Sequence, residues 1–228
     1  MRPVTRGLAP RVYRKYGEAI GDLEDRLGIY CSYCERRLPA SLAVEHVVPK
    51  SLDRALETVW DNFLLACTNC NPVKLNRPTN QRDFLWPDVD NTMRAYAYAE
   101  GGFVEVAGGL TAAQQRKAKK LIDLVGLDRH EAAGHPTPAP RDKRWQQRKD
   151  AWDAATLAKA KLAELGHAPA AQTLVFLAAE GYGFFSIWMK VFAGDPVIRA
   201  GLIQRFQGTA ADCFDAASTE IKRPGGRL

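Results

Sequence analysis

Hydrophobic side chains recur at spacings of three and four across residues 10–27, and this periodicity predicts a helix. Gly28 follows directly and is placed to end the helix in the left-handed conformation. Residues 42–48 are expected to form a short strand, because Pro49 cannot continue a strand ladder. The start of the chain is therefore expected to be one helix followed by one strand.

A second short apolar stretch, residues 62–67, leads into a cysteine turn and is expected to be a second strand. After it, Asn71 can cap a helix whose first residue is Pro72, an order of residues that favours helix starts. Two short strands and one helix make up a ββα unit.

The pattern changes beyond this unit. Residues 84–106 are expected to be irregular, with a hairpin around Gly101 and Gly102. Thr111 is placed to cap a helix that ends at Gly126. Five further helices are expected, at residues 141–165, 170–180, 184–192, 196–206 and 209–222.

The segments between and after these helices have their own signals. Residues 134–140 contain three prolines and predict a linker, Asp195 is expected to cap the helix that follows it, and residues 223–228 are expected to fray. Residues 174–193 are apolar but are interrupted by charges and glycines, so they predict two short buried helices. No membrane span is expected.

Composition places the chain among ordinary globular proteins, with 46% hydrophobic and 25% charged residues in a total of 228. The formal net charge of +6 is consistent with a polyanionic partner such as DNA or RNA. The start of the chain does not resemble a signal peptide, and an odd number of cysteines is untypical of disulfide-bonded proteins. The chain is therefore expected in a reducing cytoplasm.

Four of the five cysteines form two CxxC pairs, Cys31 with Cys34 and Cys67 with Cys70. Four thiolates complete a tetrahedral site that favours zinc, and two intervening residues let both sulfurs of a pair point inward. The long segment between the pairs must hold folded chain. A redox or incidental pair of motifs is the alternative reading, and Cys213 is expected to be a buried apolar residue.

A candidate catalytic constellation lies between the two cysteine pairs and directly after the second pair. Glu45 can bind a hard divalent cation through oxygen, and the adjacent His46 can deprotonate water near neutral pH. Asn71, at an expected helix N-terminus, can complete the cation site, while Asn62 can hydrogen-bond backbone or hold the imidazole. Neighbouring strand residues point to opposite faces, so a bend encouraged by Pro49 is needed to bring the acid and the imidazole together.

These residues resemble the motif of the HNH endonucleases, which have a ββα-metal fold. The resemblance covers about residues 28–80 and rests on Cys31, Cys34, Glu45, His46, Pro49, Asp61, Asn62, Leu64, Cys67, Cys70, Asn71 and Lys74. It implies that His46 is the general base, that Glu45 and Asn71 bind a catalytic Mg²⁺ or Mn²⁺ ion, and that Asn62 orients the base. Glu45 departs from the common aspartate, and Asn71 stands where a histidine is frequent.

The chain is therefore expected to be an α+β protein of two parts. Residues 1–95 would hold the N-terminal helix and a small zinc-stapled ββα-metal module, and residues 96–228 a mostly α-helical domain for DNA contact or partner binding. Three stretches, residues 30–35, 44–51 and 60–67, are similar to HNH subunits of bacterial anti-phage systems of the Septu and Zorya kind. That similarity implies an ATPase or another defence protein as partner.

Three cations near the constellation, Lys50, Lys74 and Arg77, are candidates for phosphate contacts. The expected reaction is metal-dependent hydrolysis of DNA, with one site nicking one strand. The alternatives are an inactive, zinc-stapled subunit that only binds nucleic acid, and a nuclease directed at RNA. Oligomeric state is left open by the sequence.

Overall fold

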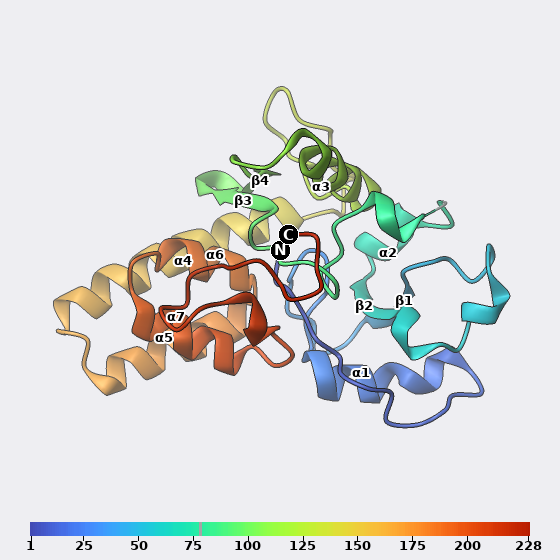
Figure 1. The fold of residues 1–228 in the computed structure, drawn as a ribbon. Helices are drawn as coiled ribbons and strands as arrows, with labels where there is room; N and C mark the ends of the chain where they lie inside the picture. The colour runs from blue at the N-terminus through green and yellow to red at the C-terminus, as the bar shows by residue number, and fades with distance from the viewer. Residues whose placement is uncertain (78) are drawn as a thin grey trace.

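Two short strands and a short helix form the centre of the N-terminal part of the protein. The computed structural model describes residues 1–77 and 79–228. In it, β1 (Leu42–His46) and β2 (Phe63–Cys67) pair antiparallel, with the last residue of β1 opposite the first of β2 (Figure 1). All of β2 is buried, because α1 (Ile20–Leu27) and α2 (Cys70–Lys74) pack against it. The ββα unit expected from the sequence is confirmed.

A hairpin and one helix follow. Strands β3 (Tyr96–Ala99) and β4 (Phe103–Val106) are joined by the tight turn at Gly101 and Gly102, as expected. Helix α3 (Ala112–Val125) begins with a capping box, in which the Thr111 hydroxyl accepts from the Gln114 N–H and the Gln114 side chain bonds back. It ends at Gly126 in the left-handed conformation.

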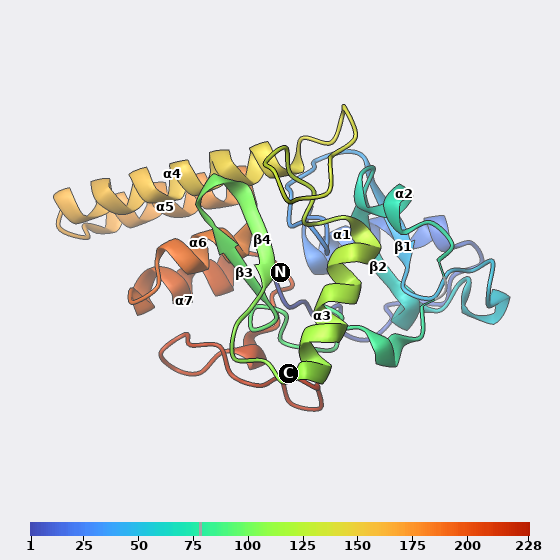
Figure 2. The same ribbon diagram turned by 90° about the horizontal axis from the view of Figure 1, so that it is seen from above.

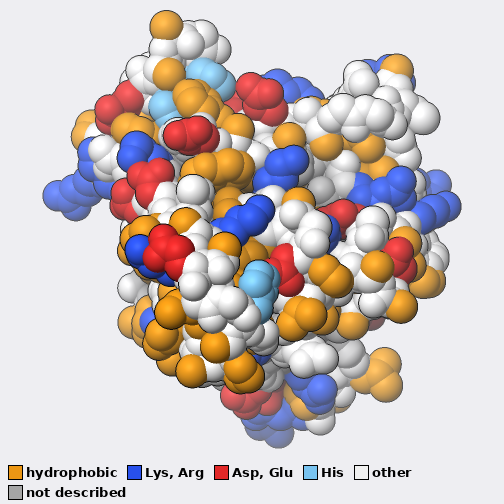
Figure 3. Space-filling model, turned by 90° about the vertical axis from the view of Figure 1, so that its left-hand side faces the viewer, with side chains coloured by type: hydrophobic (Ala, Val, Ile, Leu, Met, Phe, Trp, Pro, Cys, Tyr) orange, Lys and Arg blue, Asp and Glu red, His pale blue; other side chains and the backbone are white. Residues whose placement is uncertain are grey.

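Four helices make up the remaining side of the molecule: α4 (Arg144–Glu164), α5 (Pro169–Tyr182), α6 (Phe185–Val191) and α7 (Pro196–Arg205). Asp195 caps α7 by accepting from the Ile198 N–H, as expected. Figures 1 and 2 both show α4 and α5 side by side as a long hairpin that extends away from the ββα unit. This hairpin exposes several leucines, and the face at the helical end has hydrophobic side chains spread among charged ones (Figure 3).

Short 3-10 turns complete the secondary structure, at Tyr16–Ala19, Arg54–Leu56, Trp60–Asn62, Gln81–Asp83, Glu100–Gly102 and Ala211–Cys213. Among the described residues, no helix combines the length and the apolar character that crossing a bilayer requires.

Buried apolar side chains form two clusters. One joins α1, the ββα strands, the β3–β4 hairpin and α3, and the other lies among α4 to α7. Trp86 and Leu121 belong to the first cluster although they lie on opposite sides of the expected division at residue 95. That division stays a prediction.

The helix expected at residues 10–27 is wrong in its first part. The 3-10 turn begins at Tyr16, and Lys15 before it is extended, with φ −132°. Tyr13 instead stacks on Trp60, with ring centroids 5.9 Å apart, and its hydroxyl donates to Asp22. Residues 10–15 therefore follow a tertiary contact rather than the helical spacing.

The helix expected at residues 209–222 and the frayed tail are also wrong. Apart from the turn at Ala211–Cys213, this segment is irregular, and the Asp215 carboxylate accepts from the N–H groups of Ala217 and Thr219. Asn91, fully buried, donates to the carbonyl oxygens of Cys213 and Ile221. The last residues are held down as well, since Arg227 pairs with buried Asp90 at 2.6 Å and the Asn91 N–H donates to the Leu228 carbonyl.

The turn at Gly102 gives a stability prediction. Gly102 has φ +86°, and a Cβ there would collide with the carbonyl oxygen of Trp145 on α4. We expect Gly102→Ala to lower stability by about 3 kcal/mol, which corresponds to roughly 6–12 °C in the melting temperature of the zinc-loaded protein. Gly108→Ala, where an added Cβ meets nothing within 4 Å, is the control. Equal melting of the two variants would contradict the proposed close approach.

Candidate active site and metal centre

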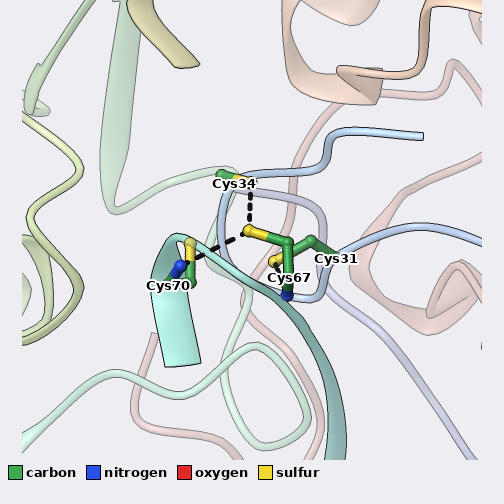
Figure 4. A group of neighbouring side chains, drawn as sticks. All are labelled: Cys31, Cys34, Cys67 and Cys70. Atoms are coloured by element: carbon green, nitrogen blue, oxygen red, sulfur yellow. Dashed lines mark hydrogen bonds between the residues drawn. The ribbon is translucent and has the colours of Figure 1, made fainter. Parts of the chain in front are cut away.

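The four paired cysteines meet at one point. Cys31 and Cys34 lie in the turn after α1, Cys67 ends β2 and Cys70 begins α2 (Figure 4). Their four sulfurs all lie within 4.8 Å of one another, and the Cys34 and Cys67 sulfurs are 3.7 Å apart. Zinc–sulfur bonds of 2.3 Å in a tetrahedron place sulfurs about 3.8 Å apart, so the cluster fits a structural zinc ion.

Hydrogen bonds and positive charge surround these sulfurs. The N–H groups of Cys67 and Cys70 lie 3.4 Å from the sulfurs of Cys31 and Cys67. Burial alone lowers the pKa of Arg36, but the thiolates of Cys34 and Cys67 raise it above its ordinary value. Four thiolates and a zinc ion carry a net charge of about −2, so cations at their edge stabilise the loaded site.

Arg144, at the start of α4, connects the cysteine cluster to the helices. Its guanidinium donates to the Cys70 sulfur at 3.1 Å and to the carbonyl oxygens of Val125 and Gly126 at the end of α3. Asp142 pairs with it at 2.6 Å, and both side chains are almost fully buried. A single side chain therefore links the metal centre, the negative end of one helix and the first turn of another.

An open cleft lies between the end of β1, helix α2 and the 3-10 turn before α1. Its walls come from the 3-10 turn before α1, the end of β1 and α2, and they are formed by Tyr16, Val44, Glu45, His46, Pro49, Lys50, Asn71, Lys74, Leu75 and Asn76. The acid, the imidazole and the amide predicted from the sequence thus share one cleft. Their catalytic roles stay predictions.

Glu45 lines the cleft and is held by Lys74 of α2. Its Oε1 atom pairs with the Lys74 ammonium at 2.8 Å and accepts from the Tyr33 hydroxyl at 3.3 Å. Burial raises the pKa of Glu45, and the Lys74 charge opposes that rise. Among the described residues no hydrogen bond is made to Oε2, so this oxygen is available to a cation.

His46 is the last residue of β1, and its ring is oriented by the loop that joins β1 to β2. Its Nε2 atom lies 2.9 Å from the Glu57 carbonyl oxygen. Because a carbonyl oxygen only accepts, Nε2 carries the proton of the neutral ring and Nδ1 keeps the lone pair that a general base needs. The rings of Tyr16 and Phe63 lie edge-on at 5.0 and 5.2 Å, and burial lowers the pKa of His46.

Asn62 organises the loop between the strands rather than touching the imidazole. Its Oδ1 atom accepts from the Val48 N–H at 2.7 Å, and its amide donates to the carbonyls of Val48 and Leu56. These bonds fix the loop that carries Glu57. The side chain therefore supports His46 through the backbone, one of the two arrangements expected for it.

Asn71 lies inside α2 and does not cap it, which corrects the expected helix start. The helix begins at Cys70, and the capping position is Asn69, whose Oδ1 atom accepts from Arg36 at 2.8 Å. The cysteine turn leads directly into the helix, so the start falls earlier than the Asn-Pro signal indicates. Asn71 remains half-buried and lines the cleft.

The three predicted phosphate contacts have different placements. Lys50 lies in the cleft and is 40% exposed. Lys74 is 1% exposed and donates inward, to Glu45 and to the His46 carbonyl at 2.7 Å. Arg77 is exposed, but its guanidinium donates to the carbonyl oxygens of Val73, Lys74, Asp123 and Leu124, where it joins the ends of α2 and α3. Lys50 and Lys74 both line the cleft, but the Lys74 charge is paired with the buried Glu45 carboxylate, so of the three only Lys50 brings a solvent-exposed charge to the cleft.

Sequence reasoning missed Tyr16, Tyr33 and Arg144. Tyr16 fits the spacing of the helix expected at residues 10–27 and was expected to be only one of its apolar positions. Tyr33 lay between two cysteines, and Arg144 in a run of charges that is typical of a solvated helix face. No local signal distinguishes these residues, because each acts on a partner far away in the sequence.

Comparison with known proteins agrees with the geometry. Residues 31–77 match the family model described as HNH endonuclease. The matched segment contains the four clustered cysteines together with Glu45, His46, Asn62 and Asn71. No curated protein matches the chain.

The cysteine cluster gives a metal-content prediction. We expect the purified protein to contain about one zinc ion per chain and Cys34→Ser to lose it, because a thiolate ligand is removed from a four-sulfur site. Cys213→Ser is the control, since Cys213 is buried but lies outside the cluster. The measurement is elemental analysis by mass spectrometry. Zinc retained by Cys34→Ser at the control level would exclude this site.

Proposed function

We propose that the protein is a metal-dependent endonuclease that hydrolyses phosphodiester bonds of DNA, nicking one strand per site. The observation that carries the proposal is the convergence of Glu45, His46 and Asn71 in one open cleft beside a four-cysteine centre. The HNH match over residues 31–77 supports the same chemistry.

The cleft has the donor set that a hard divalent cation needs. A free carboxylate oxygen of Glu45 and the amide oxygen of Asn71 are ligands that Mg²⁺ and Mn²⁺ favour. When bound there, the cation would neutralise charge on the phosphate. Lys74 keeps the Glu45 carboxylate directed toward α2, the helix that carries Asn71.

His46 supplies the base. The Glu57 carbonyl holds the proton on Nε2, so the Nδ1 lone pair accepts the proton of the attacking water. The lowered pKa keeps the ring neutral near pH 7, the form in which it acts as a base. Asn62 maintains the loop that positions the carbonyl.

The biological setting we propose is defence against phages, with an ATPase or other partner protein. Its support is the similarity of the stretches around Cys31, Glu45 and Asn62 to HNH subunits of Septu-like and Zorya-like systems. A lawn of cells that carry the gene with its genomic neighbours should show fewer phage plaques than a lawn of cells that carry the His46→Ala variant. Equal plaque counts would remove the defence role while leaving the nuclease chemistry untouched.

The nuclease proposal is tested on supercoiled plasmid with added magnesium or manganese. We expect His46→Ala to slow nicking by at least about 100-fold, because general-base catalysis contributes about 10²–10⁴-fold. His167→Ala, a substitution on the exposed histidine beside Asp195, is the matched control and should nick like the wild type.

Two outcomes separate the alternatives. A wild type that binds DNA but cuts no better than His46→Ala would identify a nucleic-acid-binding subunit without cleavage. Faster cutting of total RNA than of plasmid in the same assay would redirect the proposal to RNA.

A further inference from the structure

Tyr16 belongs to the cleft although it lies outside the matched segment 31–77. Its ring lies on the turn before α1, and the Lys50 ammonium sits over the ring face, 3.8 Å from the centroid. The same ring lies edge-on to His46 at 5.0 Å. One aromatic side chain therefore contacts both the cleft's exposed cation and its imidazole.

The Lys50 ammonium has two weak contacts, of which the Tyr16 ring is the first. Its second partner is the Glu57 carboxylate at 3.4 Å, and both side chains are about 40% exposed. An exposed pair at that distance is weak, so an incoming phosphate competes with it readily. Glu57 also supplies the carbonyl that orients His46. Tyr16, Lys50, Glu57 and His46 thus form a closed ring of contacts, and Tyr16, Lys50 and His46 of this ring line the cleft.

We propose that Tyr16 is a positioning residue that fixes the Lys50 ammonium as a clamp for a nucleic-acid phosphate next to His46, a proposal that rests on the proposed function. A free lysine side chain loses rotamer freedom when it binds a phosphate, and the ring face removes part of that freedom beforehand. The Lys50 ammonium covers one face of the Tyr16 ring. The ligand class is therefore a phosphodiester backbone rather than a stacked base.

Direct binding tests the clamp without cleavage. A fluorescent 20-base-pair DNA duplex is titrated with zinc-loaded protein, with neither magnesium nor manganese added, and anisotropy gives the Kd. We expect Lys50→Met and Tyr16→Ala each to weaken binding about 5–10-fold and to lower the salt slope by about one. The double variant should bind within about twofold of the weaker single variant, because both changes remove one contact.

Tyr16→Phe is the matched control, since it keeps the ring on which both contacts depend. It should bind within about twofold of the wild type. The NMR chemical shifts of the His46 ring protons should change in Tyr16→Ala and remain at the wild-type values in Tyr16→Phe. A general loss of stability would not produce this difference. Lys50→Met, at an exposed position, serves if Tyr16→Ala does not fold.

Several results would overturn the clamp. These are wild-type affinity in Tyr16→Ala or Lys50→Met, equal weakening in Tyr16→Phe, additive losses in the double variant, and a wild type that does not bind the duplex. Failure of the proposed nuclease is a separate readout, because a protein that fails to nick plasmid can still show the coupled loss of binding.

Discussion

The Arg144 guanidinium on the cysteine cluster is the contact on which the arrangement of the whole molecule depends. Four thiolates around a zinc ion would hold net negative charge inside the protein, and the end of α3 and the start of α4 meet at the cysteine cluster. A buried guanidinium satisfies the sulfur, the last carbonyls of α3 and the Asp142 carboxylate at once. The metal centre is therefore more than a staple for the ββα unit, because it also anchors the helical side of the chain.

Two sets of contacts, one from α2 and one from the loop between the strands, fix the end of β1 at the cleft. Lys74 draws Glu45 and the His46 carbonyl toward α2, while the Glu57 carbonyl draws the imidazole toward the opposite loop. Neighbouring residues of a strand normally face opposite sides. Here the strand stops at His46, and both side chains line one cleft. The placement of Glu45 and His46 in the cleft is thus a consequence of contacts made by α2 and by the Asn62-supported loop.

Local signals in the sequence predicted elements well where the signal and the structure share the same few residues. The Thr111 capping box, the Gly126 stop and the Asp195 cap all act within one helical turn, and α3 and α7 begin and end close to where they were expected. Helices were also expected over residues 10–15 and 209–222, where no N-cap signal of this kind supported them. Stacking on Trp60 and hydrogen bonds from Asn91 outweighed their weak helical preference.

By itself, the sequence determined which functional groups the site contains: two pairs of thiols that converge, an acid beside an imidazole, and two amides close to them in the chain. Their spacing is set by covalent chain length and by tight turns, which leave little freedom. Only the tertiary structure decided which cation faces the cleft. Lys74 and Arg77 are both cations close to the candidate site in the sequence, and both were expected to contact phosphate. In the structure Lys74 turns inward to Glu45, and Arg77 turns to the carbonyl oxygens of α3. The direction of a long side chain depends on distant partners, and sequence spacing carries no record of them.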